Sequence, residues 1–275
     1  MVVYETKKRL ITDTRGIAIQ LSIIITVYSE ETALRETVQR LLENDRGYIR
    51  EIILVVCPLS SPGCLAVCRE LDETDSRINY RLQENPGVGW AVREGMAAAG
   101  GDYIAIMSAD LETEPEAVDR MVRKIEETGC QAVIANRWMK GGGFKNYHPL
   151  KLALNFLFQQ IFKRLYATDI GDLTYGFKIL RKDLTEAITW QGTRHEIFIE
   201  TTLKPLVSGA SIGQVPTVWI GRQEGSSTNN FLINCRYVWL ALKLISALPP
   251  RRRKHSRQKY PGPSGENVRH ARHPD

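Results

Sequence analysis

Two carboxylates that are two residues apart, Asp110 and Glu112, follow a short apolar run at residues 103–107. An apolar run that ends in small and acidic residues, with a helical segment after it, is typical of a buried parallel strand that ends at the carboxyl edge of a sheet. Ligands of open α/β sheets bind at this edge. Carboxylates there can hold a divalent cation, which commonly binds substrate phosphates. The alternative interpretation is a strand end followed by a solvated acidic turn.

Apolar runs and segments with helical spacing alternate along the chain around this motif. We expect strands at residues 21–27, 51–56, 78–83, 103–107 and 132–136, and helices at residues 30–43, 64–71, 90–99 and 115–128. Such alternation predicts βαβ units and a mainly parallel sheet. Right-handed crossovers then place helices on both faces of the sheet. The expected fold class is therefore α/β.

The positive charge of this 275-residue chain is concentrated at its C-terminal end. The net charge is +6, and residues 251–275 contain eight Lys or Arg and two acidic residues, so this tail carries the whole excess. A globally basic surface is therefore not implied, and we expect no nucleic acid as a partner. A short basic tail of this kind favours an anionic surface such as a membrane.

The cysteine pattern indicates free thiols. Five cysteines are an odd number, and no two have the C-x-x-C spacing: Cys57, Cys64, Cys68, Cys130 and Cys235. Residues 1–16 are charged and polar, unlike a signal peptide. We therefore expect a reducing, cytoplasmic compartment and buried structural cysteines rather than a metal site.

Two further segments have the composition of apolar helices. Residues 231–248 contain only two charges, Arg236 and Lys243, which share one helical face, and the basic cluster 251–254 follows Pro249-Pro250. Two charges within the segment count against a membrane-spanning helix. The pattern predicts a helix in the membrane interface, held by anionic headgroups, and a helix packed on the domain is the alternative. Residues 150–166 carry a broad apolar stripe, which is typical of a helix packed on the protein core.

Several motifs in order resemble the inverting family 2 glycosyltransferases. They are LSIIITVYSEE at residues 21–31, NPGVGWAVREG at 85–95 and GDYIAIMSADLE at 101–112. Later segments resemble the dolichol-phosphate mannose synthase branch of that family: NRW at 136–138, KGGG at 140–143, DLTYGFK at 172–178, HEIFIE at 195–200, and Arg222 with Gly225 and Ser226. The resemblance covers about residues 20–248.

The resemblance implies a GT-A fold, which is a Rossmann-like, mainly parallel sheet with helices on both faces. We expect an N-terminal extension at 1–20, the glycosyltransferase domain at 21–230, an apolar helix at 231–250 and a basic tail at 251–275. A GDP- or UDP-linked sugar would bind across the strand ends, with Mg²⁺ or Mn²⁺ held by Asp110 and Glu112. The implied donor-binding residues are Thr26, Tyr28, Glu30, Cys57, Gly87, Arg93, Ser108, Ala109, Arg222 and Ser226.

On the acceptor side the resemblance implies transfer of a hexose, of the mannose or glucose class, to a polyprenyl phosphate with inversion. A phosphate is already anionic near neutral pH, so no strong general base is needed. Arg137, Lys140 and Lys151 are the candidates for binding that phosphate. Asp110, Arg137, Asp172 and Glu200 are the expected catalytic residues. Asp172 and Glu200 would orient the sugar or these cations, and stabilisation of loops is the alternative for each. We expect a peripheral enzyme on the cytoplasmic face of a membrane.

Three residues depart from the family pattern. Cys57 stands in the loop where the family usually has paired aspartates, Ser108 replaces the first acid of D-A-D, and Glu112 replaces a common glutamine. A hydroxyl is a weaker ligand for a hard cation than a carboxylate. Two alternatives therefore remain: a soluble family 2 glycosyltransferase with a small-molecule or saccharide acceptor, and a non-catalytic GT-A-fold binding protein.

Overall fold

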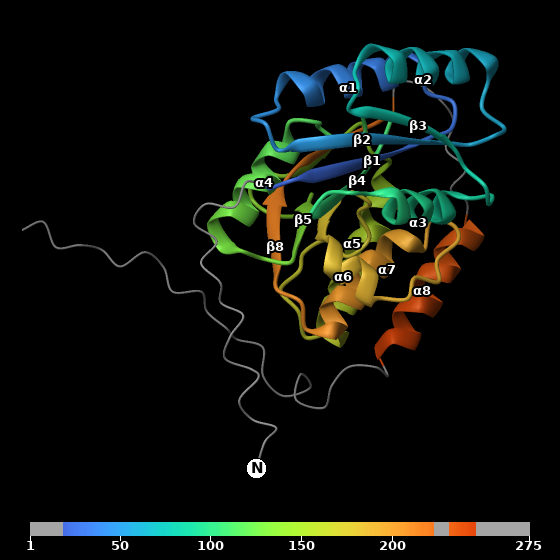
Figure 1. Ribbon diagram of the computed structural model, residues 1–275. Helices are drawn as coiled ribbons and strands as arrows, with labels where there is room; N and C mark the ends of the chain where they lie inside the picture. The colour runs from blue at the N-terminus through green and yellow to red at the C-terminus, as the bar shows by residue number, and fades with distance from the viewer. Residues whose placement is uncertain (1–18, 223–230, 246–275) are drawn as a thin grey trace, which may run out of the picture.

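The computed structural model describes residues 19–222 and 231–245, and these form a mixed α/β fold (Figure 1). The central sheet has the strand order β3-β2-β1-β4-β7-β5-β8. Its strands are β1 (Leu21–Val27), β2 (Ile49–Val56), β3 (Ile78–Leu82), β4 (Tyr103–Ser108), β5 (Ala132–Asn136), β7 (Lys178–Arg181) and β8 (Ile212–Pro216). The predicted α/β class is confirmed.

Helices cover both faces of the sheet, as the alternating pattern predicts (Figure 1). The helices α1 (Thr32–Glu43), α2 (Pro62–Thr74) and α4 (Ala117–Thr128) pack on one face. The helices α3 (Val88–Ala98), α6 (Lys182–Ala187) and α7 (Ile197–Ser208) lie on the other. Helix α2 begins before the expected residue 64, because the Ser61 hydroxyl accepts the Cys64 N–H at 3.0 Å and Pro62 occupies the first turn.

Strand β7 is the feature of the sheet that periodicity does not predict. It has only four residues and lies antiparallel between β4 and β5. Because β7 runs opposite to β4, the residues that precede it, 172–177, lie at the carboxyl edge of the sheet beside the end of β4. A small parallel sheet of β6 (Gly143–Lys145) and β9 (Val218–Ile220) joins this edge through a bridge between Thr113 and Trp219.

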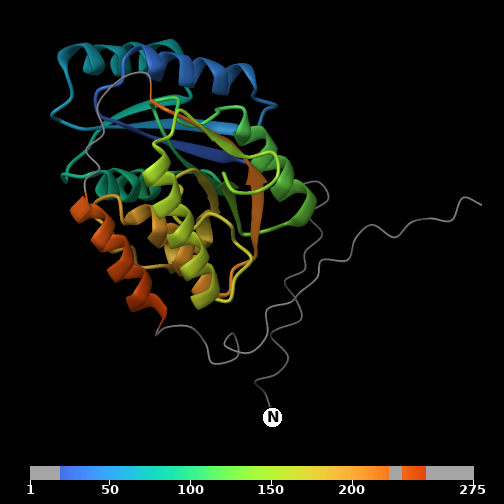
Figure 2. The same ribbon diagram turned by 180° about the vertical axis from the view of Figure 1, so that it is seen from behind.

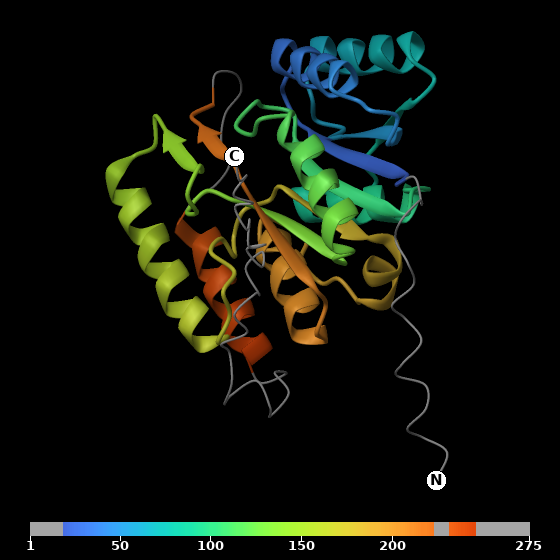
Figure 3. The same cartoon turned by 90° about the vertical axis from the view of Figure 1, so that its left-hand side faces the viewer.

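The helices α5 (Pro149–Leu165) and α8 (Phe231–Ile245) lie side by side (Figures 2 and 3). The Tyr166 hydroxyl donates to the Ala241 carbonyl at 2.6 Å, and Phe162 packs in the same cluster. The expectation that the stripe of α5 faces the core is wrong. Gln159 and Phe162 are the buried residues of α5. Six large apolar side chains of α5 are 45–62% exposed: Leu150, Leu154, Phe156, Leu157, Ile161 and Leu165.

Helix α8 begins at the predicted residue and is described as far as Ile245. Arg236 and Lys243 are both exposed, and the Lys243 ammonium lies 5.0 Å from the centroid of the Trp239 ring. The basic cluster at 251–254 lies outside the described residues. Within the described part of the chain, no helix combines the length and apolar character that crossing a membrane requires. The interfacial helix stays a prediction.

Candidate active site

Asp110 and Glu112 meet at the carboxyl end of β4, and Arg222 pairs with both. Asp110 is buried, and its Oδ1 accepts the Ser108 hydroxyl at 2.6 Å and the Glu112 N–H at 3.1 Å. Leu111 has a φ of 56°, an uncommon left-handed conformation for such a residue, and it turns the chain between the two acids. The Arg222 guanidinium donates to Asp110 Oδ2, and its Nε lies 3.3 Å from Glu112 Oε1. Ser108 therefore orients Asp110 at the position where the family has an acid.

The electrostatics of the carboxylate pair favour a bound cation. Burial raises the pKa of Glu112, the neighbouring Asp110 raises it further, and Arg222 opposes both effects. The Trp219 indole N–H also donates to Glu112 Oε2 at 3.1 Å. The guanidinium of Arg222 contacts both carboxylates and offsets part of the repulsion between them.

The carboxylate pair fits a divalent cation only with help from a ligand. Among the described residues, no group of three or more His, Cys, Asp or Glu side chains gathers into a metal centre. Mg²⁺ is often held by one or two carboxylates together with substrate phosphates and water. Asp110 and Glu112 supply hard oxygen donors, and they already hold one cationic group. The donor set therefore suits a cation that is completed by a diphosphate.

The expected donor-binding residues of the first strand lie next to this pair. Thr26 pairs with Ser108 across β1 and β4, so the two strand ends adjoin. Tyr28 is exposed in the following turn. Glu30 is buried, and its Oε2 accepts the N–H groups of Tyr28 and Ser29, each at 2.9 Å. Glu30 therefore shapes the turn that presents Tyr28.

Gly87 is the N-cap residue just before α3, and its φ of 109° favours glycine. A Cβ at this position would also meet the carbonyl oxygen of Thr193, in the loop before α7. Arg93 lies on the same helix, with its Cζ 3.8 Å from the centroid of the Trp90 ring. The structure therefore packs the Gly87 loop against the loop before α7 and engages Arg93 with an aromatic ring.

The remaining donor-site predictions fall in the loops around these strand ends. Cys57 is half-buried after β2, and its N–H donates to the Val27 carbonyl at 3.0 Å. Ala109 is buried, and its carbonyl oxygen lies 3.5 Å from the Thr37 hydroxyl. Ser226 lies outside the described residues. Cys57, Cys64, Cys68 and Cys130 are free thiols.

A second arginine–carboxylate pair, Arg137 with Asp172, is buried at the same edge. Arg137 follows β5 and Asp172 precedes β7, and two hydrogen bonds of 2.6 and 2.9 Å join the side chains. Burial opposes the charge on Arg137, but the Asp172 carboxylate outweighs it and raises the arginine pKa. Gln159 donates to Asp172 at 3.3 Å and to the Thr174 hydroxyl at 3.0 Å. This network fixes the guanidinium in one position.

Aromatic rings enclose the Arg137 guanidinium and link it to the carboxylate pair. Its Cζ lies 4.2 Å from the centroid of the Tyr175 ring and 5.1 Å from that of Phe144. The hydroxyls of Tyr175 and Thr113 hydrogen-bond at 2.7 Å, and Thr113 directly follows Glu112. The two charged pairs therefore belong to one site.

The other acceptor-side predictions are placed differently. Lys140 and Lys151 are exposed, the first in the turn before β6 and the second in the first turn of α5. Glu200 is buried and accepts the N–H groups of Gln191 and Gly192 at 2.8 and 2.6 Å, with Lys204 at 2.5 Å. These contacts hold the loop at residues 191–192, as expected if Glu200 stabilises a loop.

Three residues of the site were missed by the sequence reasoning: Gln159, Tyr175 and Trp219. Tyr175 lies inside the matched DLTYGFK segment, so the motif offered a signal for it. Gln159 and Trp219 have no spacing that could have identified them. Lys178, in the same segment, is fully buried, and its ammonium donates to the Phe198 carbonyl at 2.6 Å and the Thr202 hydroxyl at 2.7 Å. Burial lowers the pKa of Lys178 to about 7.

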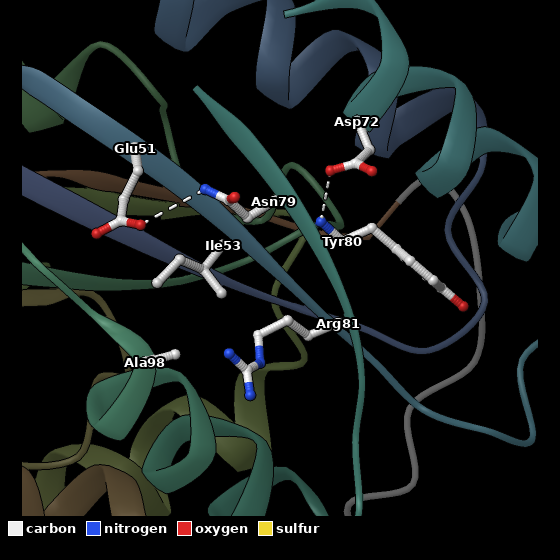
Figure 4. Close-up of a pocket in the computed structure, with 7 residues that line it drawn as sticks. All are labelled: Glu51, Ile53, Asp72, Asn79, Tyr80, Arg81 and Ala98. Carbon is white, nitrogen blue, oxygen red and sulfur yellow. Dashed lines mark hydrogen bonds between the residues drawn. The ribbon is translucent and has the colours of Figure 1, made fainter. Parts of the chain in front are cut away.

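A separate cavity of about 290 Å³ lies beside the edge strand β3 (Figure 4). Its wall includes Glu51, Asp72 and Arg81. The Tyr80 N–H donates to Asp72 at 3.0 Å, which covers part of the strand edge. The cavity shares no residue with the two charged pairs, and we assign it no part in the site.

Residues 22–189 match the family model described as Glycosyl transferase family 2. The chain belongs to this family. It is 27% identical over 210 residues to a dolichol-phosphate mannosyltransferase of Pyrococcus furiosus, over 76% of this chain and 58% of that protein. It is 34% identical over 126 residues to the uncharacterized glycosyltransferase YkcC of Bacillus subtilis, over 45% of this chain and 39% of the relative. The chain thus spans less than two thirds of the length of either relative.

Among solved structures, the chain is similar to glucosyl-3-phosphoglycerate synthase from Mycobacterium tuberculosis in complex with UDP. The TM-score is 0.64 at 16% identity, over 84% of this chain and 81% of that one. A second structure of that enzyme, with Mn²⁺, UDP and phosphoglyceric acid, gives a TM-score of 0.62 at the same identity, over 84% of this chain and 80% of that one. At this identity the likeness shows the fold alone, and the predicted GT-A fold is confirmed.

Proposed function

We propose that this chain is a glycosyltransferase that transfers a hexose, with inversion, from a nucleotide sugar to a polyprenyl phosphate at a membrane surface. The observation that carries this proposal is the position of the Arg137–Asp172 pair beside the exposed apolar helix α5. A polyprenyl phosphate joins an anion to an apolar chain, and a site for it needs a fixed cation next to apolar surface. The mannosyltransferase relative supports the same acceptor class.

The donor half of the proposal rests on the carboxylate pair. Asp110 and Glu112 would hold Mg²⁺ or Mn²⁺ on the diphosphate of a GDP- or UDP-linked sugar. A bound cation supplies Lewis-acid stabilisation of the charge that develops on the leaving diphosphate. Arg222 adds a guanidinium, which matches phosphate oxygens bidentately. Structures of glucosyl-3-phosphoglycerate synthase hold UDP with Mn²⁺ or Mg²⁺, which supports this choice of ligand and cations.

The acceptor half rests on Arg137. Asp172 takes hydrogen bonds from Nε and Nη2 of this guanidinium. A guanidinium carries five N–H donors, so others are available for a phosphate. Lys140 and Lys151 are exposed and supply further positive charge nearby in the sequence. The phosphate oxygen is anionic near neutral pH, so it attacks the anomeric carbon without a strong general base.

The membrane half rests on what we call the apolar face, which consists of the exposed large apolar side chains of α5 and α8. Its members are Leu150, Leu154, Phe156, Leu157, Ile161, Leu165, Val238, Trp239 and Leu242. Lys151 stands at one end of α5, and Lys163 and Arg164 stand at the other. Apolar side chains flanked by cations suit a helix pair that lies in an anionic membrane interface. We therefore place the protein peripherally on the cytoplasmic face of a membrane.

The test compares two acceptors in the same preparation: a long polyprenyl phosphate in anionic vesicles and soluble geranyl phosphate. We expect the wild type to sediment with the vesicles at low salt and to use both acceptors. The double variant L154S/L157S should lose vesicle binding and transfer to the long acceptor. The control Leu82→Ser, which changes an equally exposed leucine on β3, should do neither. A wild type that transfers sugar to no prenyl phosphate contradicts the proposed function.

A soluble phosphorylated acceptor is the second candidate. Glucosyl-3-phosphoglycerate synthase, which shares the fold, has been solved with phosphoglyceric acid bound. Arg137 and the lysines would suit such an anion as well. This candidate requires transfer to a small phosphorylated acid and no sedimentation with vesicles. A non-catalytic binding protein would instead show no turnover with any acceptor. If nucleoside diphosphates and Mn²⁺ produce no thermal shift, donor binding itself is contradicted.

A further inference from the structure

Five aromatic side chains form a continuous row along the edge of the site. In order they are Phe156, Trp138, Phe144, Tyr147 and Trp219, and we call them the aromatic row. The distances between successive ring centroids are 5.4, 4.6, 5.1 and 4.7 Å, with tilted or edge-on contacts. Such geometry is favourable for aromatic pairs. The rings come from α5, β6, β9 and the segments between β5 and α5.

The row joins the apolar face to the carboxylate pair. At one end Phe156 is 49% exposed on α5. At the other end the Trp219 indole N–H donates to Glu112. Between the ends, the ring of Phe144 lies 5.1 Å from the Cζ of Arg137. The row therefore passes the proposed phosphate-binding arginine on the way from the membrane side to the donor side.

The rings are not enclosed in the core, although they are large and apolar. The four rings after Phe156 are all half-buried. The Trp138 indole N–H is buried and has no acceptor among the described residues, and an unsatisfied group of this kind calls for an explanation. A contiguous, partly exposed apolar patch on a protein surface commonly marks a binding site.

We infer that the aromatic row binds the isoprene units of the acceptor nearest its phosphate. This inference rests on the proposed function and adds to it the place of the lipid chain. The occupant follows from three observations: the row is continuous with the exposed side chains of α5, a cation lies beside its middle, and its far end meets the donor site. Rigid rings bind branched, unsaturated carbon units through dispersion contacts over a large area.

The variants Phe144→Leu and Phe156→Leu test this inference, because each removes a ring and keeps an apolar side chain. For each, the KM for geranyl phosphate should rise about tenfold, as the loss of an aromatic contact of about 1.4 kcal/mol implies. The KM for the nucleotide sugar should change less than about twofold. The matched control is Phe158→Leu on the same helix, which stacks on Phe162 at 4.4 Å and lies outside the row.

A binding measurement without turnover separates the two proposals. Titration with geranyl phosphate should change the tryptophan fluorescence of the wild type, and Trp138→Phe should lose most of this change. Inorganic phosphate should produce little change in either protein. If the wild type uses prenyl phosphates but Phe144→Leu raises the KM of the nucleotide sugar instead, the row binds the donor and this inference is wrong while the proposed function stands. If all row variants keep the wild-type KM for geranyl phosphate, the inference is also wrong.

Discussion

Two aspartate–arginine pairs stand at the same edge of the sheet, and their surroundings differ. In the pair of Asp172 and Arg137, the side chains are 0% and 7% exposed, two aromatic rings lie against the guanidinium, and the Gln159 amide donates to the carboxylate. In the pair of Asp110 and Arg222, the arginine is 24% exposed, and it also contacts Glu112. The first pair is almost completely enclosed, whereas the arginine of the second pair is partly open to solvent.

This difference indicates how the two halves of the site work. A buried pair joined by two hydrogen bonds keeps a cation in one place, which suits the proposed positioning of an acceptor anion. Under the proposed function, a partly exposed arginine beside two carboxylates would balance their charge before a divalent cation and a diphosphate bind. The comparison can be tested by removing one charge from each pair in turn.

The largest effect is expected from Asp172→Asn. Removing one partner of a buried ion pair leaves an uncompensated charge and costs about 3–5 kcal/mol of unfolding free energy. The matched control is Asp183→Asn, which breaks the exposed pair with Arg181, and exposed pairs contribute about 0–1 kcal/mol. Urea denaturation of both variants measures the difference. Equal losses in the two variants would show that the Arg137–Asp172 pair is not the fixed element that we describe.

Asp110→Asn should leave the fold intact and abolish nucleotide binding that depends on a divalent cation. Arg222 can reach solvent when its partner is neutralised, so the loss of stability should be smaller than for Asp172→Asn. Glu112→Gln should weaken binding less, since Asp110 remains. Calorimetry with UDP and GDP, with and without Mn²⁺, measures both effects. Glu114→Gln, which changes a nearby acid paired with Arg120, is the control. Unchanged metal-dependent binding in Asp110→Asn would exclude it as the principal ligand.

Lys178 is buried close enough to the Arg137–Asp172 pair to feel both charges, and it provides another test of the comparison. Its pKa falls from an ordinary value of 10.5 to about 7 because it is buried. Between these values the unfolded chain binds more protons than the folded one, so stability should rise with pH across this window and be lost as the pH falls to about 7. Lys178→Met should remove that rise, which is on the order of a few kcal/mol. Denaturation near both ends of the window measures this rise in stability, with Lys182→Met as a control at a half-buried lysine. If the unfolding free energy changes with pH in the same way in Lys178→Met and in the wild type, the lowered pKa of Lys178 is contradicted.

The smallest effect is expected at Cys57, in the loop after β2. A thiol accepts hydrogen bonds poorly, so this loop should discriminate weakly between bases. Cys57→Ala should change the ratio of UDP to GDP affinity by less than about threefold, whereas the loss of a normal hydrogen bond would cost about 1 kcal/mol. Competition calorimetry gives the ratio. A sharp preference for one base in the wild type that survives in Cys57→Ala would show that other residues read the base.

The sequence was most informative where structure is periodic. The first five strands and four helices have apolar runs or stripes of the length and spacing that predict their type, and strand β1 matches its expected bounds. Asp110 could be identified because it lies just beyond the end of such a strand, and Arg137 because it stands in a segment that resembles the family. Strand β7 could not, because four residues carry too little periodicity to predict a strand or its direction.

The sequence also could not predict contacts between residues that are far apart in the chain. Arg222 is far from Asp110 in the chain, and only the folded sheet brings β9 beside the end of β4. The error on α5 has a different physical cause. An apolar stripe looks the same whether it faces a protein core, a membrane or a ligand, so Leu154 and Leu157 gave no signal of their exposure.

The place of β7 has a consequence for how the chain folds during synthesis. Strands β1 to β4 can pair as soon as they are made, but β5 reaches them only through β7, which is synthesised about forty residues later. Until then the open side of β4 is an unprotected strand edge that another chain could join. Domains generally begin to fold at the N-terminus as they are synthesised. A nascent chain that ends before residue 181 should therefore be the form most prone to aggregate, and translation through this segment should complete the sheet.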